Sequence, residues 1–164
     1  MRLASDALFN SEAALFCSKL LPEFEEDRSL RDIYVLNTSC EEWTRLVSSL
    51  ATSGLHVDIT EPFAVSEGFD AALAFRHVQT TDPVTLTVQL SQNVSAHSHF
   101  FIPEEVEFDL DPGKIETEAD VARVLDFMRA LGEILSKDVI LTQEDSEDEI
   151  IATYKPATGE FLTQ

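Results

Sequence analysis

Between positions 84 and 90 the chain alternates strictly between apolar and polar side chains. Val84, Leu86, Val88 and Leu90 take every second position, and Thr, Thr and Gln lie between them. Because successive side chains of a strand point to opposite faces, this pattern predicts a strand with one face buried and one face in water. A sheet built from such strands needs a second layer that covers its apolar face.

A long amphipathic helix is predicted at positions 118–136 and can supply that layer. Thr117 is its expected N-cap, with Asp120 at the position that completes a capping box. A second amphipathic helix is predicted after Ser39 and ends before Gly54, which suits the left-handed position beyond a helix. The apolar stripe of the long helix consists of Val121, Val124, Leu125, Met128, Leu131 and Leu135.

Six further segments have the β-branched, aromatic or alternating apolar residues that are typical of strands. A shorter helix is indicated within positions 66–80, and positions 155–159 indicate a turn before a C-terminal tail. We therefore expect an α+β fold: one mixed, largely antiparallel sheet with helices packed mainly on one face. Strand order does not follow from these patterns. The six segments are 32–37, 55–60, 94–102, 106–110, 139–142 and 150–154.

The beginning of the chain predicts an N-terminal helical arm. Apolar residues recur at a spacing of four within residues 5–27, and Pro22 is expected to end or kink this helix. The chain length of 164 residues fits a single domain, 1–164, that is long enough to bury a sizeable core. We assign residues 1–30 to the arm and residues 31–164 to the α+β core.

Acidic side chains outnumber basic ones 31 to 11, so the net charge is −20 at pH 7. The bias is uneven, because residues 100–164 have a net charge of −12 and residues 1–99 a net charge of −8. A field of this sign repels nucleic acid and anionic membranes and attracts basic proteins. We expect a basic or amphipathic protein partner, no nucleic acid and no membrane. The acidity can equally serve solubility alone.

The sequence lacks the motifs of common enzyme classes. Its five glycines are widely separated, so they form no phosphate-binding loop, and no Gly-x-Ser-x-Gly elbow or Ser/His/Asp arrangement occurs. Cys17 and Cys40 lie on predicted apolar stripes, which favours buried free thiols over a disulfide. We therefore expect no catalytic residues and no cofactor. Residues 1–10 contain no apolar run of signal-peptide length, so a cytoplasmic location is expected.

Two histidines are the first candidate for a metal site. On a strand, His97 and His99 point to the same face, and Glu107 and Asp109 share a face of the strand that follows. Two imidazoles with one or two carboxylates can bind zinc or iron. The alternative is that these residues are the solvent-facing side chains of an antiparallel sheet, where alternating polar residues are the rule.

The acidic run between the last two predicted strands is a second candidate site. It lacks the glycine and the ligand spacing of a calcium-binding loop. We interpret it as a solvated loop or, in functional terms, as a docking surface for a basic partner. The docking residues would be Glu144, Asp145, Glu147, Asp148 and Glu149.

These observations favour a non-catalytic acidic protein-binding module, such as an inhibitor-type, immunity-type or chaperone-type protein for a basic partner. This interpretation rests on bulk properties, since no motif identifies a family. The alternative is a metal-binding protein or metal-dependent enzyme that uses His97, His99 and nearby carboxylates. A homodimer formed through a sheet edge or the N-terminal arm is a third hypothesis.

Overall fold

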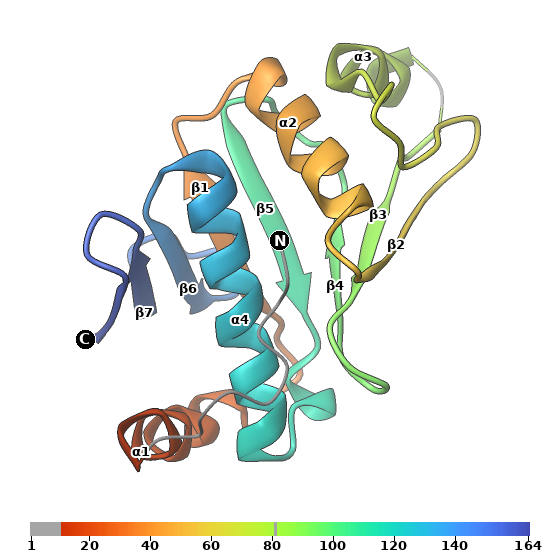
Figure 1. The fold of residues 1–164 in the computed structure, drawn as a ribbon. Helices are drawn as coiled ribbons and strands as arrows, with labels where there is room; N and C mark the ends of the chain where they lie inside the picture. Colours follow the sequence, from red (N-terminus) through yellow and green to blue (C-terminus); the bar gives the residue numbers. More distant parts are fainter. Residues whose placement is uncertain (1–10, 81) are drawn as a thin grey trace.

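The computed structural model describes residues 11–80 and 82–164 and confirms the α+β class, with helices packed against one eight-stranded sheet (Figure 1). The helices are α1 (Ser11–Leu20), α2 (Cys40–Ala51), α3 (Ala71–Thr80) and α4 (Glu118–Leu135), with short 3-10 helices at Leu21–Phe24 and Pro112–Lys114. The strands are β1 (Arg31–Leu36), β2 (His56–Ile59), β3 (Leu86–Gln89), β4 (Ser95–Ser98), β5 (Glu105–Leu110), β6 (Val139–Gln143), β7 (Ile150–Lys155) and β8 (Glu160–Thr163).

The sheet has the strand order β2-β3-β4-β5-β1-β6-β7-β8, and every neighbouring pair is antiparallel. β1 lies in the middle because it pairs with both β5 and β6, so that Ile33 is opposite Phe108 on one side and Leu141 on the other. β2 follows β1 and α2 in the chain but pairs with β3 at the edge. The early strand–helix–strand segment therefore contributes no parallel pair.

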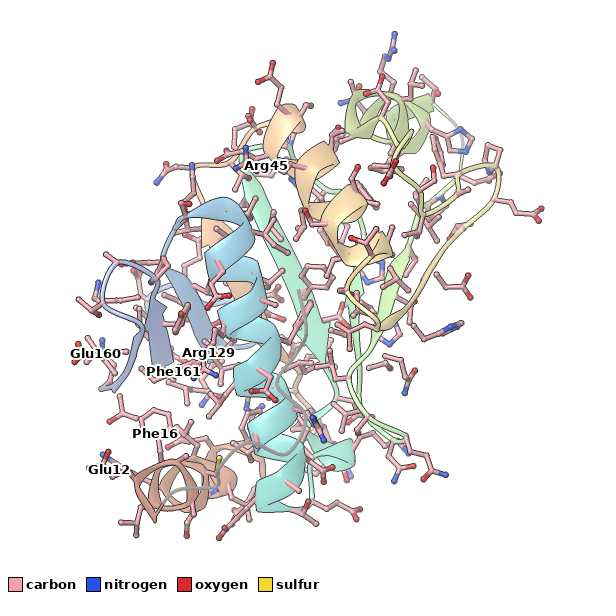
Figure 2. The ribbon with its side chains drawn as sticks, in the orientation of Figure 1. Glu12, Phe16, Arg45, Arg129, Glu160 and Phe161 are labelled. Carbon is pink, nitrogen blue, oxygen red and sulfur yellow. The ribbon has the colours of Figure 1, made fainter. Side chains whose placement is uncertain are left out.

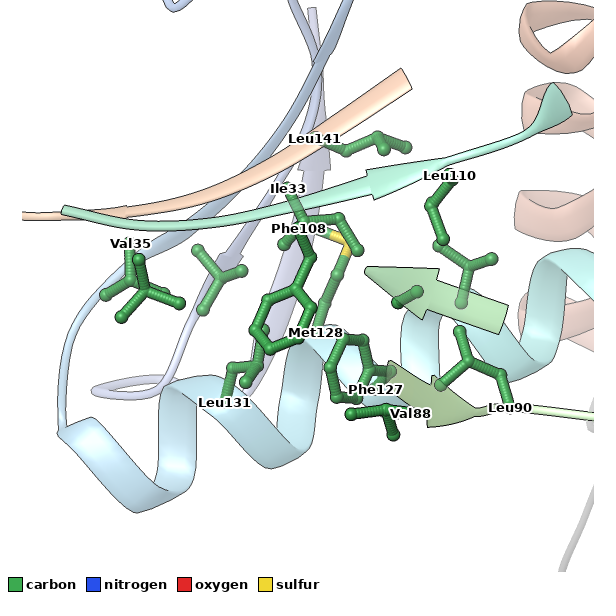
Figure 3. Close-up of a cluster of buried hydrophobic side chains, with 14 of the residues drawn as sticks. Ile33, Val35, Val88, Leu90, Phe108, Leu110, Phe127, Met128, Leu131 and Leu141 are labelled. Atoms are coloured by element: carbon green, nitrogen blue, oxygen red, sulfur yellow. The ribbon is translucent and has the colours of Figure 1, made fainter. Parts of the chain in front are cut away.

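The hydrophobic core lies between the sheet and the helix layer. α2 and α4 lie side by side across one face of the sheet (Figure 1). Side chains of α4, such as Met128 and Leu131, point toward Ile33 of β1 and Phe108 of β5 (Figure 3). The rings of Phe108 and Phe127 meet edge to face with their centroids 5.0 Å apart. All six residues of the predicted apolar stripe of α4 are buried.

The helix boundaries follow the predicted caps. The Thr117 hydroxyl accepts a hydrogen bond from the Asp120 backbone N–H at 3.2 Å, and the Asp120 carboxylate accepts one from the Thr117 N–H at 3.0 Å. The Ser39 hydroxyl accepts from the Glu42 N–H at 3.3 Å at the start of α2. Gly54, beyond the end of α2, has φ +84°, which a glycine adopts without steric strain.

α1 and β8 pack together at the end of the helix layer (Figure 2). The rings of Phe16 and Phe161 are 5.9 Å apart, and the guanidinium of Arg129 on α4 lies 5.4 Å from the centre of the Phe161 ring. α1 ends two residues before Pro22, as predicted, and residues 1–10 of the predicted arm lie outside the described residues. β8 occupies the segment that the sequence predicted to be a tail.

The predicted strand at 94–102 is too long. β4 ends at Ser98, because Phe100 has φ +54° and this left-handed conformation cannot continue a strand. The Phe100 ring is buried in the helix layer, with its centroid 4.8 Å from that of Trp43. The next side chain, Phe101, is 63 % exposed. Of the two adjacent rings, one therefore meets the helix layer and the other meets solvent.

Replacing Phe108 by Ala should lower the free energy of unfolding by about 3–5 kcal/mol, because it leaves a cavity between β5 and α4. Phe101→Ala removes a ring of the same size from an exposed position and should cost less than about 1 kcal/mol. Urea denaturation of both variants measures the difference. Equal losses would contradict the assignment of the core face.

Candidate functional site

The sheet face opposite the helices is polar and rich in carboxylates. In β1, Ile33 and Val35 belong to the core, so Asp32 and Tyr34 point to the opposite face. β5 repeats this alternation, with carboxylates between its buried apolar residues. We call this surface the acidic face; it consists of Asp32, Tyr34, Asp58, His97, His99, Glu105, Glu107, Asp109 and the loop 144–149.

The strand register brings acidic side chains together at the centre of the acidic face. Asp32 of β1 is directly opposite Asp109 of β5, and Tyr34 is directly opposite Glu107. Like charges directly opposite each other on neighbouring strands are destabilising. Apolar or oppositely charged pairs would hold β1 and β5 together better, so this arrangement lowers the stability of the sheet.

Asp32 is the buried carboxylate of the acidic face, with only 2 % of its surface exposed. The loop 144–149 covers it: the Asp145 backbone N–H donates to Asp32 Oδ2 at 2.7 Å, and the Tyr34 hydroxyl donates to the same oxygen at 3.3 Å. Burial raises the pKa of Asp32, and these two hydrogen bonds oppose the rise. Burial and the Asp32 charge also raise the pKa of Tyr34, so its hydroxyl remains a neutral donor.

Glu107 shares the Tyr34 hydroxyl, which lies 3.4 Å from Glu107 Oε1. Burial raises the pKa of Glu107 from its ordinary 4.5 to about 7. The charges of Asp32, Glu105 and Asp145 contribute to this rise. At neutral pH, Glu107 is therefore only partly ionised, because it is half-buried and its neighbours are acidic.

A second pair of carboxyl groups links β5 to the acidic loop. Burial raises the pKa of Glu105, and a hydrogen bond with the carboxyl group of Glu147 raises it further. Two carboxyl groups can form such a bond only while one of them holds a proton. The acidic loop therefore folds over the sheet at two points, at Asp32 and at Glu105.

One group of three carboxylates is close enough to share a cation. Oxygens of Asp32, Glu107 and Asp145 lie within 4.8 Å of one another, and the described part of the chain contains no other group of three potential metal ligands at this spacing. Oxygen ligands suit hard cations such as calcium or magnesium, and paired carboxylates also suit the guanidinium of arginine. The chemistry that this cluster can perform is therefore cation binding.

The two predicted metal-binding histidines have different surroundings. His99 Nε2 lies 2.9 Å from Asp109 Oδ2, which brings together one predicted pair. Both ring nitrogens of His97 lie near hydroxyl groups instead, at 3.2 and 3.0 Å. Glu107 belongs to the cluster around Asp32, so the four predicted residues do not form one ligand group. Metal binding by these four residues stays a prediction.

A groove adjoins the carboxylate cluster and has an apolar and an acidic side. Lys137 also lines the groove, but its Nζ lies 3.0 Å from Glu42 Oε1, so its charge is already paired. The predicted docking loop therefore borders a surface that is both apolar and anionic. The apolar lining comes from Tyr34, Leu36, Ile140 and Ile150, and the acidic lining from Asp138, Glu147 and Asp148.

Asp32 and Tyr34 are two central site residues that the sequence patterns did not single out. Their signal is the alternation with Ile33 and Val35, which places both polar side chains on the face away from the core. That alternation alone does not reveal their neighbours. Glu107 comes close only because β1 pairs with β5, and this pairing joins segments that are far apart in the sequence.

Comparison with known proteins identifies no relative, since no family model, no curated protein and no solved structure matches the chain. None of the helices in the described segments has the length and apolar character that crossing a membrane requires. Both cysteines are free, with Cys17 buried and Cys40 half-buried. The site is therefore interpreted from its own geometry and electrostatics.

Replacing Glu107 by Gln should raise the free energy of unfolding at about pH 8 by roughly 1–3 kcal/mol. The folded protein binds the Glu107 proton more tightly than the unfolded chain, because the pKa is about 7 in the folded state against an ordinary 4.5. The stability of the native protein therefore falls as the pH rises from 4.5 to about 7. Gln does not ionise and avoids this loss, whereas at about pH 4 the two proteins should differ little.

Urea denaturation at both pH values measures the effect. The control variant Glu67→Gln removes the carboxylate of an exposed residue elsewhere, so it has the same net charge as Glu107→Gln. Because Glu67 is exposed, this change should alter the free energy of unfolding by less than about 0.5 kcal/mol. If Glu107→Gln is no more stable than this control at the higher pH, the interpretation that neighbouring carboxylates and burial raise the pKa of Glu107 is wrong.

Proposed function

We propose that the protein is a non-catalytic binding module for a basic protein, and that the acidic face with its loop 144–149 is the surface that binds this partner. An inhibitor-type, immunity-type or chaperone-type role fits such a module. The cytoplasmic location expected from the sequence is part of the proposal.

The observation that carries the proposal is a crowding of carboxylates that have no Lys or Arg partner in the described part of the chain. Within the described residues, no Lys or Arg forms an ion pair with Asp32, Glu105, Glu107 or a carboxylate of the loop 144–149. Partly buried like charges weaken the free protein. A cationic partner removes that repulsion, so the arrangement that destabilises the free protein strengthens the complex.

The burial of Asp32 and Glu107 argues against solubility as the only role of the acidic face. Charges that serve solubility need contact with water, which spreads them over exposed positions. Asp32 is 2 % exposed and lies under the acidic loop, and Glu107 is half-buried. Carboxylates in such places contribute little to solubility, and they lower stability unless a ligand uses them.

The groove beside the cluster supports a protein as the ligand. Protein interfaces combine an apolar centre with a polar rim. Here apolar side chains from β1, β6 and β7 lie beside the carboxylates of the loop. The net charge of −20 would also accelerate the encounter with a basic partner.

If the basic partner binds nucleic acid, an acidic surface can inhibit it by blocking its nucleic-acid site. Proteins that bind nucleic acid hold its phosphates with Lys and Arg side chains. An acidic surface that occupies those side chains competes directly with the phosphates. This argument favours the inhibitor-type or immunity-type role over the chaperone-type role.

Affinity capture from a lysate of the native host, with identification by mass spectrometry, should recover a basic protein that high salt releases. Neutralising the loop through Glu→Gln and Asp→Asn changes at Glu144, Asp145, Glu147, Asp148 and Glu149 should weaken binding of the purified partner by at least about tenfold. The Asp145 change keeps the backbone N–H that donates to Asp32.

The matched control carries five Glu→Gln changes at exposed positions away from the acidic face, so that both variants have the same net charge. It should bind the partner with less than about a threefold change. Capture of no basic protein, or equal weakening by both variants, would show that the loop is not the binding surface. The control positions are Glu12, Glu41, Glu61, Glu67 and Glu160.

A further inference from the structure

The acidic face ends at a pair of exposed apolar residues. Phe101 is 63 % exposed and its neighbour Ile102 is 45 % exposed. The other large exposed apolar side chains of the described residues, Leu15, Leu73 and Leu162, are single residues on three different elements. Single exposed apolar side chains are normal on any protein surface, whereas contiguous apolar patches mark interaction sites. Phe101 and Ile102 are adjacent in the sequence.

The backbone that presents this pair is strained and held on both sides. Phe100 has φ +54°, a conformation that costs a non-glycine residue roughly 1–2 kcal/mol. Its ring is fixed in the core, 4.8 Å from the ring of Trp43. After the pair, Thr38 donates its N–H to the Glu104 carbonyl at 2.9 Å and its hydroxyl to the Pro103 carbonyl at 2.8 Å. Strained segments that are held in this way occur preferentially at functional sites.

The surroundings of the pair are acidic. Phe101 and Ile102 line a small hollow together with Glu105 and Glu107 of β5. The Phe101 ring lies 5.5 Å from the ring of His99, which belongs to the acidic face. The apolar pair and the carboxylates therefore form one continuous surface. An occupant of this surface has to contribute both apolar and cationic side chains.

We propose that Phe101 and Ile102 are the apolar anchor of this surface, and that the occupant is a partner segment that presents cationic and apolar side chains on the same face. The inference rests on the proposed function, because it assigns the partner chemistry at the same face. A second copy of the chain is a poor occupant, since it would bring another net charge of −20 against these carboxylates.

Two synthetic peptides of equal length and charge provide the probe: one repeats Arg-Arg-Leu-Leu, which places both residue types on each face of an extended chain, and the other repeats Arg-Arg-Ser-Ser. The native protein should bind the Arg–Leu peptide at least tenfold more tightly than the Arg–Ser peptide, because only the former covers the anchor. The double variant Phe101→Ser, Ile102→Ser should remove this difference and leave the affinity for the Arg–Ser peptide unchanged. Titration calorimetry measures all four affinities.

The control is Leu15→Ser, Leu73→Ser, which removes two exposed apolar side chains elsewhere and should keep the native preference. Urea denaturation confirms that both double variants fold. If the double variant Phe101→Ser, Ile102→Ser still prefers the Arg–Leu peptide, the assignment of these two residues as the anchor is wrong, while binding of both peptides still supports the proposed function. If neither peptide binds to the native protein, both the anchor and the proposed function are contradicted.

Light scattering tests whether a second copy of the chain, and not a basic partner, occupies the patch. The native protein should show no self-association that depends on Phe101. A dimer that forms at high concentration and disappears in Phe101→Ser would assign the patch to a second copy of the chain, and would overturn the inference.

Discussion

The packing of α4 against the middle of the sheet is the contact on which the remaining structure depends. Phe127, Met128 and Leu131 of α4 are buried against the central strands β1 and β5 (Figure 3). Because the helices cover one face only, the alternate residues of the same strands have to point away from the core. Their polar side chains collect on a single surface, and this one-sided burial creates the acidic face.

The acidic face then shows a conflict between stability and binding. A sheet selected for stability alone would place apolar or oppositely charged pairs between β1 and β5. Here Asp32 is opposite Asp109, and Glu107 lies close enough to Asp32 and Asp145 to share a cation with them. Local rules of stability fail most often where a protein performs its function. The failure of those rules on this face, and not the bulk acidity, is the physical reason for proposing a cationic partner.

Much of the fold could be predicted because its signals are local. The alternation between Val84 and Leu90, the capping box at Thr117 and the stripe of α4 all depend on residues within a few positions of one another. Strand order depends on long-range pairing, and neither β1 nor β5 carries a sequence signal for the other. β8 was missed because it directly follows a turn and its apolar residues, Phe161 and Leu162, are adjacent, so they do not alternate with polar ones.

The candidate site could be predicted only in part, for the same reason. The acidic loop was recognised from composition, and His99 and Asp109 were placed on suitable faces of their strands. The sequence did not indicate that the loop folds back onto Asp32, because this contact joins positions 113 residues apart through a backbone N–H. Every residue except proline has a backbone N–H donor, so the identity of a residue does not indicate that its backbone makes such a contact.

The most direct test is a carbon-13 NMR titration of the side-chain carboxyl groups in the free protein and with the Arg–Leu peptide. We expect Glu107 to titrate with a pKa of about 7 in the free protein, above its ordinary value of 4.5, and to titrate at lower pH once a cationic ligand occupies the acidic face. A Glu107 pKa near 4.5 that the peptide does not change would mean that its carboxylate is neither crowded nor near the ligand. That result would contradict the assignment of this face as a site for a basic partner.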